Sequence, residues 1–230
     1  MSTVLIVDED PAIRTLLTAI LRRSGYDAVQ ASDGYEALDL LARQSFHAII
    51  LDLLMPGITG LEVLERMPAS MQQRTILLTA ASEKTRKSVD LRRVHAMLRK
   101  PFDLDQFLDA ISSVGQPHVL IVEDDLPSQY LVARAISSNG FRVTTAADGT
   151  EALQALALGR YDALVVDLKL PTVSGYDVIQ HANTRPDAPP IVVLSVLEQP
   201  ERPLDGIAAY LRKPEGFDVV TDMVRSLTHA

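Results

Sequence analysis

The sequence predicts an α/β protein made of two doubly wound, five-stranded parallel sheets in tandem. Short apolar runs rich in β-branched residues alternate with segments of helical hydrophobic spacing along the 230 residues. The pattern also occurs twice, because VLIVDED at Val4–Asp10 returns as VLIVEDD at Val119–Asp125, an offset of 115 (119 − 4). We therefore assign residues 1–115 to a first domain and 116–230 to a second.

Each strand of the first domain is expected to be followed by a helix, with right-handed crossovers. Pro11 suits the first turn of the first helix, and Gly25 suits its end. The expected strands are 4–7, 26–31, 47–51, 75–78 and 96–98. The expected helices are 13–21, 36–43, 61–67, 82–94 and 104–114.

The second copy differs from the first between its fourth and fifth strands. The offset is 116 at Ser195 (against Thr79) but 113 at Lys213 (against Lys100), so this segment is three residues shorter. It also carries Pro200 and Pro203, and a proline inside a helix costs about 3 kcal/mol. We predict that the fourth helix of the second domain is reduced to a turn or a loop.

Composition excludes several classes of function. The formal net charge of −8 argues against nucleic-acid or anionic-membrane binding through bulk electrostatics. There are no cysteines, so disulfides and thiolate metal sites are ruled out. No apolar run has the length of a membrane span, and no basic segment precedes the first apolar run. We expect a soluble, cytoplasmic protein.

Polar residues stand at equivalent strand ends in both copies. In a doubly wound sheet the first and third strands are neighbours, so their terminal carboxylates converge and repel by about 1 kcal/mol per pair at 4 Å even in water. A cation between them relieves this repulsion, and a small cluster of oxygen ligands suits Mg²⁺. The set is Asp8, Glu9, Asp52, Thr79 and Lys100 in the first copy, and Glu123, Asp124, Asp167, Ser195 and Lys213 in the second.

A metal, a lysine and a hydroxyl around one carboxylate form a phosphoryl-transfer site. Asp52 or Asp167 would be the nucleophile and would form an acyl phosphate. Each of these aspartates also begins a D-x-x-x-P-x-x-x-G block, Asp52–Gly60 and Asp167–Gly175. With the acidic pair and the Lys-Pro pair, both halves resemble the response-regulator receiver domains of two-component signalling, which have a CheY-like, flavodoxin-like fold.

The resemblance implies that a phosphohistidine of a sensor histidine kinase or a phosphotransfer protein phosphorylates Asp52 and Asp167, with Mg²⁺ as cofactor. It also implies cis peptides before Pro101 and Pro214. The implied metal ligands are Asp52, Glu9 (direct), Asp8 (through water) and the Leu54 backbone oxygen, and in the second copy Asp167, Asp124 (direct), Glu123 (through water) and the Lys169 backbone oxygen. The groups implied to contact or approach the phosphoryl group are Lys100, Thr79, Lys213 and Ser195.

Three departures from the family pattern concern the metal site and the switch. Glu9 stands where the family usually has Asp, and its carboxylate reaches one methylene further. The aromatic switch position is Tyr210 in the second copy but Met97 in the first. Val196 follows Ser195 where the first copy has a small alanine. Together with the shortened segment, these departures favour a second domain that is a pseudo-receiver or has an altered output face.

The resemblance implies a signalling module that phosphorylates and dephosphorylates only itself and is not otherwise an enzyme. Its output would be a contact with a downstream protein or with a second copy of the chain, or onward transfer in a phosphorelay. A regulatory fragment of a longer response regulator, such as a diguanylate cyclase with the second receiver as an adaptor, stays an alternative. A phosphatase with an Asp nucleophile would need a second Asp two residues on, where Leu54 and Lys169 stand. A dinucleotide site is disfavoured, since G-x-G-x-x-G is absent.

Overall fold

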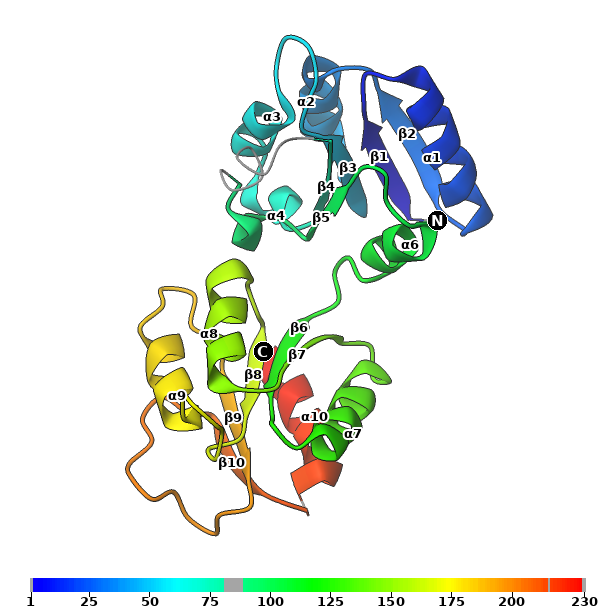
Figure 1. The fold of residues 1–230 in the computed structure, drawn as a ribbon. Helices are drawn as coiled ribbons and strands as arrows, with labels where there is room; N and C mark the ends of the chain where they lie inside the picture. Colours follow the sequence, from blue (N-terminus) through cyan, green and yellow to red (C-terminus); the bar gives the residue numbers. More distant parts are fainter. Residues whose placement is uncertain (1, 81–88, 215, 229–230) are drawn as a thin grey trace. The chain divides into compact units, whose positions relative to one another are not determined.

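The computed structural model describes residues 2–80, 89–214 and 216–228. The chain divides into two compact units, Met1–Gly115 and Gln116–Ala230. Each unit holds one five-stranded sheet whose strands are all parallel (Figure 1). Within the described residues no helix is both long and apolar enough to cross a membrane.

The first unit has the sheet order β2-β1-β3-β4-β5. This order places β1 between β2 and β3, so the chain ends of β1 and β3 are neighbours. Its strands are β1 (Thr3–Val7), β2 (Asp27–Ala31), β3 (Ala48–Asp52), β4 (Thr75–Thr79) and β5 (Ala96–Arg99). Its helices are α1 (Pro11–Arg23), α2 (Gly34–Arg43), α3 (Gly60–Arg66), α4 (Ala69–Gln72), the 3-10 helix η1 (Leu91–Arg93) and α6 (Leu104–Ser112).

The second unit repeats this order as β7-β6-β8-β9-β10. The registers repeat as well, since Val4 pairs with Ala48 in the first unit and Val119 pairs with Ala163 in the second. Its strands are β6 (His118–Val122), β7 (Arg142–Ala146), β8 (Ala163–Val166), β9 (Ile191–Ser195) and β10 (Ala209–Arg212). Its helices are α7 (Leu126–Ser137), α8 (Gly149–Leu158), α9 (Gly175–Asn183) and α10 (Gly216–Thr228).

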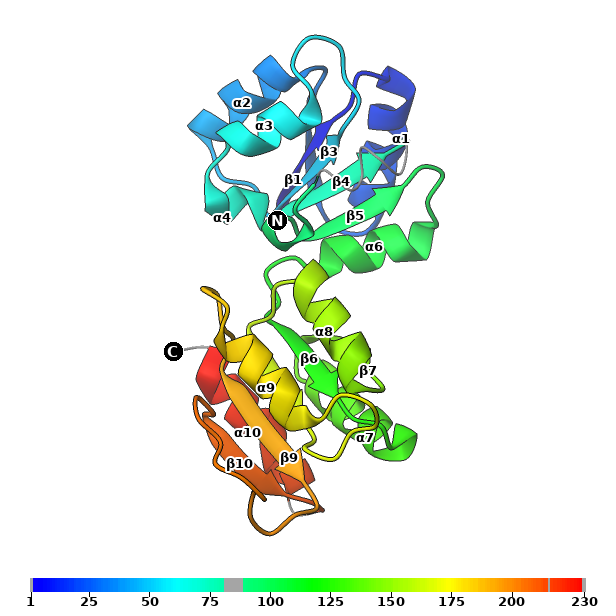
Figure 2. The same ribbon diagram turned by 60° about the vertical axis from the view of Figure 1, so that its left-hand side comes forward.

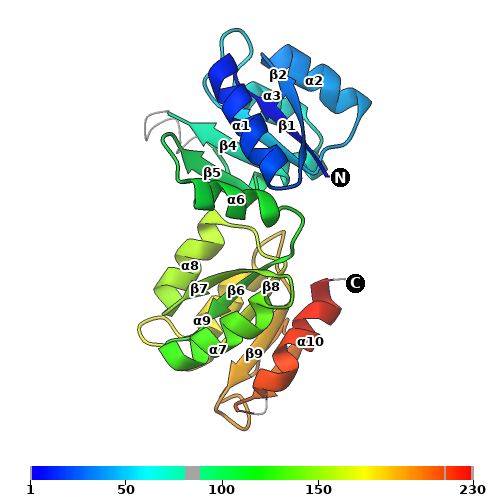
Figure 3. The same ribbon diagram turned by 90° about the vertical axis from the view of Figure 1, so that its right-hand side faces the viewer.

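Helices cover both faces of each sheet, which is why the strands read as continuous apolar runs (Figure 3). Successive side chains of a strand point to opposite faces. In β1, Leu5 therefore packs toward α2 and α3, while Val4 packs toward α1 and α6. The second unit divides its core in the same way, with α8 and α9 on one face and α7 and α10 on the other.

Aspartates at the carboxyl ends of the strands also start the helices. Asp10 caps α1 by accepting a hydrogen bond from the amide of Ala12, and Asp125 caps α7 by accepting one from Ser128. Asp33 and Asp148 cap α2 and α8 in the same manner. A side-chain oxygen at this position satisfies an amide that has no partner within the helix.

The expected helix over 82–94 is wrong in its described part. Residues 82–88 lie outside the described residues, and 89–94 contain only the 3-10 helix η1. Asp90 has an extended backbone, and its carboxylate accepts hydrogen bonds from the backbone and side chain of Arg92. These local bonds give the chain an alternative to the α-helix. The short helix α4, which begins after Pro68, was not expected from the sequence pattern.

In the second unit, residues 196–208 form neither helix nor strand (Figure 2). We call this segment the β9–β10 loop. The loop stands where the first unit carries η1, and it contains the two prolines that disfavour a helix. The predicted absence of a fourth helix in this unit therefore agrees with the structure.

Candidate functional site

In the first domain, one lysine joins two strand-end aspartates. The ammonium of Lys100 donates hydrogen bonds to Asp8 at 2.7 Å and to Asp52 at 2.6 Å. Asp8 follows β1 and Asp52 ends β3, and both carboxylates are buried. The sheet order makes this contact possible, because β1 and β3 are adjacent and Lys100 follows β5 two strands further on.

The other predicted groups of the first domain surround this ion pair. Thr79 ends β4 and is fully buried. The amide of Leu54 donates to the second oxygen of Asp52 at 3.1 Å, which turns the Leu54 backbone around the carboxylate. Glu9 is exposed to solvent beside Asp8.

The second domain repeats the ion pair and adds a hydroxyl. Lys213 donates to Asp167 at 2.7 Å and to Glu123 at 2.5 Å. The hydroxyl of Ser195, fully buried at the end of β9, donates to the other oxygen of Asp167 at 2.8 Å. The Lys169 amide donates to that same oxygen at 3.2 Å. All the strand-end groups predicted around Asp167 are therefore together.

The carboxylates of the second domain are gathered closely enough to hold a cation. Oxygen atoms of Glu123, Asp124 and Asp167 all lie within 4.8 Å of one another, and this is the only such group among the described residues. Two of these side chains are buried, and Asp124 is exposed. Hard oxygen donors with one side open to water fit Mg²⁺, which keeps several of its own waters.

Burial and ion pairing act in opposite directions on the charged groups of the site. Burial alone would lower the pKa of Lys100, but hydrogen bonds to Asp52 and Asp8 and their charges raise it above the ordinary value. The pKa of Lys213 is raised in the same way by Asp167 and Glu123. Burial also raises the pKa of Glu123, although Lys213 opposes this shift. Both lysines are therefore positively charged at neutral pH.

Glycine ends each D-x-x-x-P-x-x-x-G block for a packing reason. A Cβ at Gly60 would lie 2.1 Å from the backbone oxygen of Asp52, and one at Gly175 would lie 2.0 Å from that of Asp167. A side chain at either position would displace the backbone of the aspartate. The sequence motif contains these glycines, but only the structure shows that they allow the start of the next helix to approach the backbone of the strand-end aspartate.

Sequence reasoning missed one position beside the acidic pairs. The guanidinium of Arg14 on α1 donates to the backbone oxygens of Asp8 at 2.7 Å and Glu9 at 3.0 Å. In the second domain the equivalent residue is Gln129 (14 + 115), which donates to the backbone oxygen of Glu123 at 2.8 Å. The offset of 115 identifies the pair, but nothing in the sequence shows that either side chain turns toward the site.

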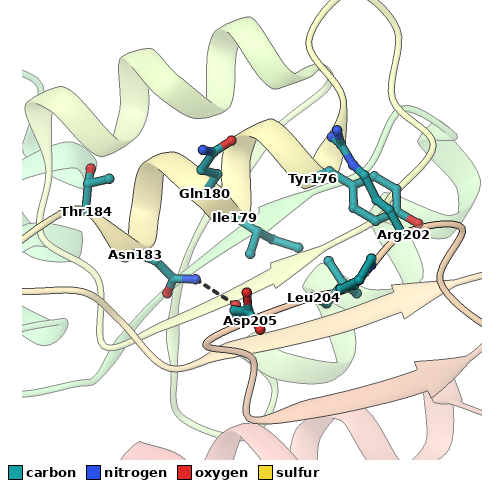
Figure 4. A pocket seen from close by; sticks show the side chains of 9 residues that line it. Tyr176, Ile179, Gln180, Asn183, Thr184, Arg202, Leu204 and Asp205 are labelled. Atoms are coloured by element: carbon teal, nitrogen blue, oxygen red, sulfur yellow. Dashed lines mark hydrogen bonds between the residues drawn. The ribbon is translucent and has the colours of Figure 1, made fainter.

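The β9–β10 loop packs against α9 beside the second site. Tyr210, which the family resemblance implies as the switch position, donates from its hydroxyl to the backbone oxygen of Leu197 at 2.9 Å. Arg202 lies over the ring of Tyr176 at 4.4 Å from its centroid and forms an ion pair with Asp177 at 3.0 Å. Between the loop and α9 is an open pocket of about 410 Å³, where the side chain of Asn183 donates to the backbone of Asp205 (Figure 4).

Comparison with known proteins identifies the family of both halves. The profile of the response regulator receiver domain matches residues 4–112 and 119–225, which is most of the chain. The chain is 35% identical over 111 residues to sporulation initiation phosphotransferase F of Bacillus subtilis, covering 47% of this chain and 89% of that protein. This chain therefore belongs to the response regulator receiver family, with two such domains in tandem.

Other relatives match one domain at a time. Response regulator MprA of Mycobacterium ulcerans is 34% identical over 113 residues, or 47% of this chain and 49% of that protein. The match thus spans about half the length of that relative. Among solved structures, the response regulator TrrA of Thermotoga maritima, determined in complex with Mg²⁺ and BeF, is 32% identical with a TM-score of 0.45. It covers 50% of this chain and 99% of that one.

Both Lys-Pro peptide bonds, Lys100–Pro101 and Lys213–Pro214, are cis. This agrees with what the family resemblance implies. The chain is thus a member of the two-component signalling class by its fold and its family.

Proposed function

We propose that this chain accepts phosphoryl groups on both Asp52 and Asp167 and so carries two working receivers. The observation that supports this most directly is the lysine-bridged carboxylate pair, which both domains contain at 2.5–2.7 Å. A salt bridge with only a structural role would need one carboxylate per lysine, and it would not need a hydroxyl group bonded to the aspartate. In the second domain, Ser195 also donates to Asp167.

In the transfer, an oxygen of the aspartate attacks the phosphorus of a phosphohistidine. A phosphorus–oxygen bond forms, the phosphorus–nitrogen bond breaks, and the imidazole leaves with the electron pair of that bond and takes up a proton. The lysine ammonium neutralises negative charge on the phosphoryl oxygens, and Thr79 or Ser195 donates a hydrogen bond to one of them. The acyl phosphate then hydrolyses without a further protein nucleophile, so we propose no activity on outside substrates.

The cofactor that fits the residues is Mg²⁺. The protein ligands would be the side chains of Asp52 and Glu9, with Asp8 acting through water, and the Leu54 backbone oxygen. In the second domain they would be Asp167, Asp124, Glu123 through water, and the Lys169 backbone oxygen. When bound, the ion supplies charge neutralisation between the carboxylates and the incoming phosphoryl group.

The partners would be a sensor histidine kinase or a histidine phosphotransfer protein on the input side. Output would be contact with a downstream protein, or with a second copy of this chain, in the cytoplasm. The net charge of −8 supports a protein partner over nucleic acid or an anionic membrane surface.

The test is to incubate the full chain with Mg²⁺ and acetyl phosphate and to count phosphoryl groups by intact-mass spectrometry. We expect two additions, of which one is lost in Asp52→Asn and the other in Asp167→Asn. A single addition that is lost only in Asp52→Asn would make the second domain an adaptor. Retention of both additions in the double variant would place the acceptors elsewhere and reject the proposal.

A further inference from the structure

We propose that the residue pair Arg14 and Gln129 sets different divalent-cation affinities for the two domains, with the second domain binding more tightly. This inference rests on the proposed function, because it concerns the same carboxylate sites. The inference assigns a role to a position outside the predicted ligand set. It also predicts that two sites with the same number of carboxylates differ in their affinity for a divalent cation.

The two acidic clusters carry the same number of carboxylates. The first has Asp8, Glu9 and Asp52, and the second has Glu123, Asp124 and Asp167. Each also has one lysine bridging two of its carboxylates. The acidic groups and the bridging lysine therefore cannot by their charge distinguish the two sites.

Arg14 adds a fixed positive charge to the first site. Its guanidinium donates to the backbone oxygens of Asp8 and Glu9, and to the side chain of Gln30 at 3.3 Å. Gln30 is held in turn by Thr18 at 2.9 Å. All three acceptors of Arg14 are neutral groups, so its positive charge remains beside the residue pair that would bind the cation.

Gln129 makes the equivalent contact without a charge. Its amide donates to the backbone oxygen of Glu123 at 2.8 Å and to that of Ala146 at 3.2 Å. Arg14 and Gln129 are both half-buried. Arg14 on α1 and Gln129 on α7 therefore occupy equivalent positions and contact the backbone of the acidic pair in each domain. The two positions differ by one unit of charge.

The arrangement of the carboxylates agrees with this difference. Among the described residues only the second domain brings three acidic side chains within 4.8 Å. Three close carboxylates raise the negative potential at that point, and no arginine charge stands at the Gln129 position to offset it, so this charge balance favours a dication. As an order of magnitude, a dication and a unit charge about 8 Å apart in water of low ionic strength repel enough to change the affinity about three- to tenfold, and added salt reduces this factor.

Lys169 is the competing explanation, because it adds a positive charge to the second domain where the first has Leu54. Lys169 is exposed, and its flexible side chain keeps the ammonium group in water, where solvent and salt screen the charge. The guanidinium of Arg14 is instead fixed by three hydrogen bonds. We therefore assign the larger effect to Arg14.

The experiment is a Mg²⁺ titration of the full chain followed by amide NMR, with no phosphodonor present. The amides of Asp10 and Leu54 report the first site, and those of Asp125 and Lys169 report the second. We expect the second site to saturate at a lower Mg²⁺ concentration. Arg14→Gln should lower the dissociation constant of the first site about three- to tenfold, and Gln129→Arg should raise that of the second by a similar factor.

The charge-preserving variant Arg14→Lys is the matched control, and it should leave the first site close to its original affinity. Equal affinities in the unmodified chain, or an Arg14→Gln variant that changes nothing, would overturn the inference while leaving the phosphoacceptor proposal intact. A larger effect from Lys169→Met than from Arg14→Gln would also overturn it. Absence of any Mg²⁺ response at either site would reject this inference, and the acetyl phosphate experiment would then judge the proposed function separately.

Discussion

The two domains hold the same strand-end groups but continue differently after the fourth strand. In the first, the described part of this connection contains the 3-10 helix η1, and the switch position is Met97. In the second, the β9–β10 loop has no helix, and Tyr210 bonds to its backbone at Leu197. The carboxylate–lysine geometry is nevertheless almost the same.

This difference teaches that the site depends on the strand ends and not on the conformation of the connection between the fourth and fifth strands. Asp167, Ser195 and Lys213 each stand at or just after a strand of one parallel sheet, and these strands pair in the same register as their counterparts, with one pair fewer between β8 and β9. The chain between β9 and β10 can therefore differ in length and conformation from its counterpart without moving these residues.

The largest expected effect concerns the bridging lysines. Lys213→Met should reduce the free energy of unfolding of the second domain by about 3 kcal/mol, because it leaves Glu123 and Asp167 buried with no cation between them. Lys100→Met should reduce that of the first domain by less, about 2 kcal/mol, since its side chain is 17% exposed against 8% for Lys213.

Hydrogen exchange followed by mass spectrometry measures each domain separately within the full chain. Added Mg²⁺ should restore part of the lost protection in both variants, because a cation again lies between the carboxylates. Equal protection in Lys213→Met and the unmodified protein would show that this ion pair does not stabilise the fold. A greater loss in the first domain would reverse the comparison.

The second prediction uses the glycine that begins the second helix of each domain. A Cβ at Gly149 would lie 2.1 Å from the backbone oxygen of Val173, whereas one at Gly34 would meet mainly the side-chain methyl groups of Ile58 and Val63 at 2.5 and 2.6 Å. Side chains can rotate away more easily than backbone. Gly149→Ala should therefore destabilise its domain by about 3 kcal/mol and Gly34→Ala by about 1 kcal/mol.

Urea unfolding followed by hydrogen exchange in each domain is the measurement. Each variant serves as the control of the other, because the same residue type is changed at the same position of equivalent helices. A Gly34→Ala variant that is destabilised as strongly as Gly149→Ala would show that Ile58 and Val63 cannot move aside.

Much of this architecture could be predicted from the sequence because the signals are short-range and repeated. Apolar strand runs, strand-end carboxylates and the offset of 115 are sufficient for the parallel sheets and for the set of residues at their carboxyl edge. Pro200 and Pro203 were sufficient to predict the missing helix of the second domain. These features depend on local conformation, which the residue type restricts directly.

Two kinds of feature could not be predicted from the sequence. One depends on competition between helix formation and local side-chain hydrogen bonds, and the other depends on the direction in which a side chain points. Residues 89–94 carry a helical pattern, but the side-chain bonds of Asp90 to Arg92 favour a 3-10 turn there. The side chain of Arg14 turns toward the acidic pair and also contacts Gln30, which comes from a neighbouring strand. Hydrophobic periodicity contains no information about such contacts.

The third prediction concerns the switch position. Tyr210→Phe removes the hydrogen bond to the backbone of Leu197, and we expect the β9–β10 loop to lose about 1 kcal/mol of local stability. Burial raises the pKa of the Tyr210 hydroxyl, so this bond is made by the neutral phenol at neutral pH. Hydrogen exchange of the 196–208 amides is the measurement. The first domain, with Met97 at this position, should be unaffected.

Tyr176→Phe is the matched control for this loop. Its hydroxyl accepts a hydrogen bond from the amide of Glu201 at 2.7 Å, further along the same segment. If Tyr210 alone connects the site to the loop, only Tyr210→Phe should change the response of the loop amides to acetyl phosphate. Identical responses in both variants would contradict a special role for the switch position.

The smallest effect on stability is expected for Arg202, a residue of the β9–β10 loop that contacts α9. Arg202→Ala removes its contact with the ring of Tyr176 and its ion pair with Asp177, and should cost about 1 kcal/mol of local stability because the ion pair is largely exposed. Arg212→Ala, which removes only the exposed pair with Glu198, should cost less than about 0.5 kcal/mol. Amide exchange over 196–208 should rise in the first variant and not in the second. If both variants leave that exchange unchanged, the loop is held by Tyr210 and its apolar contacts, and the arginine is only a surface residue.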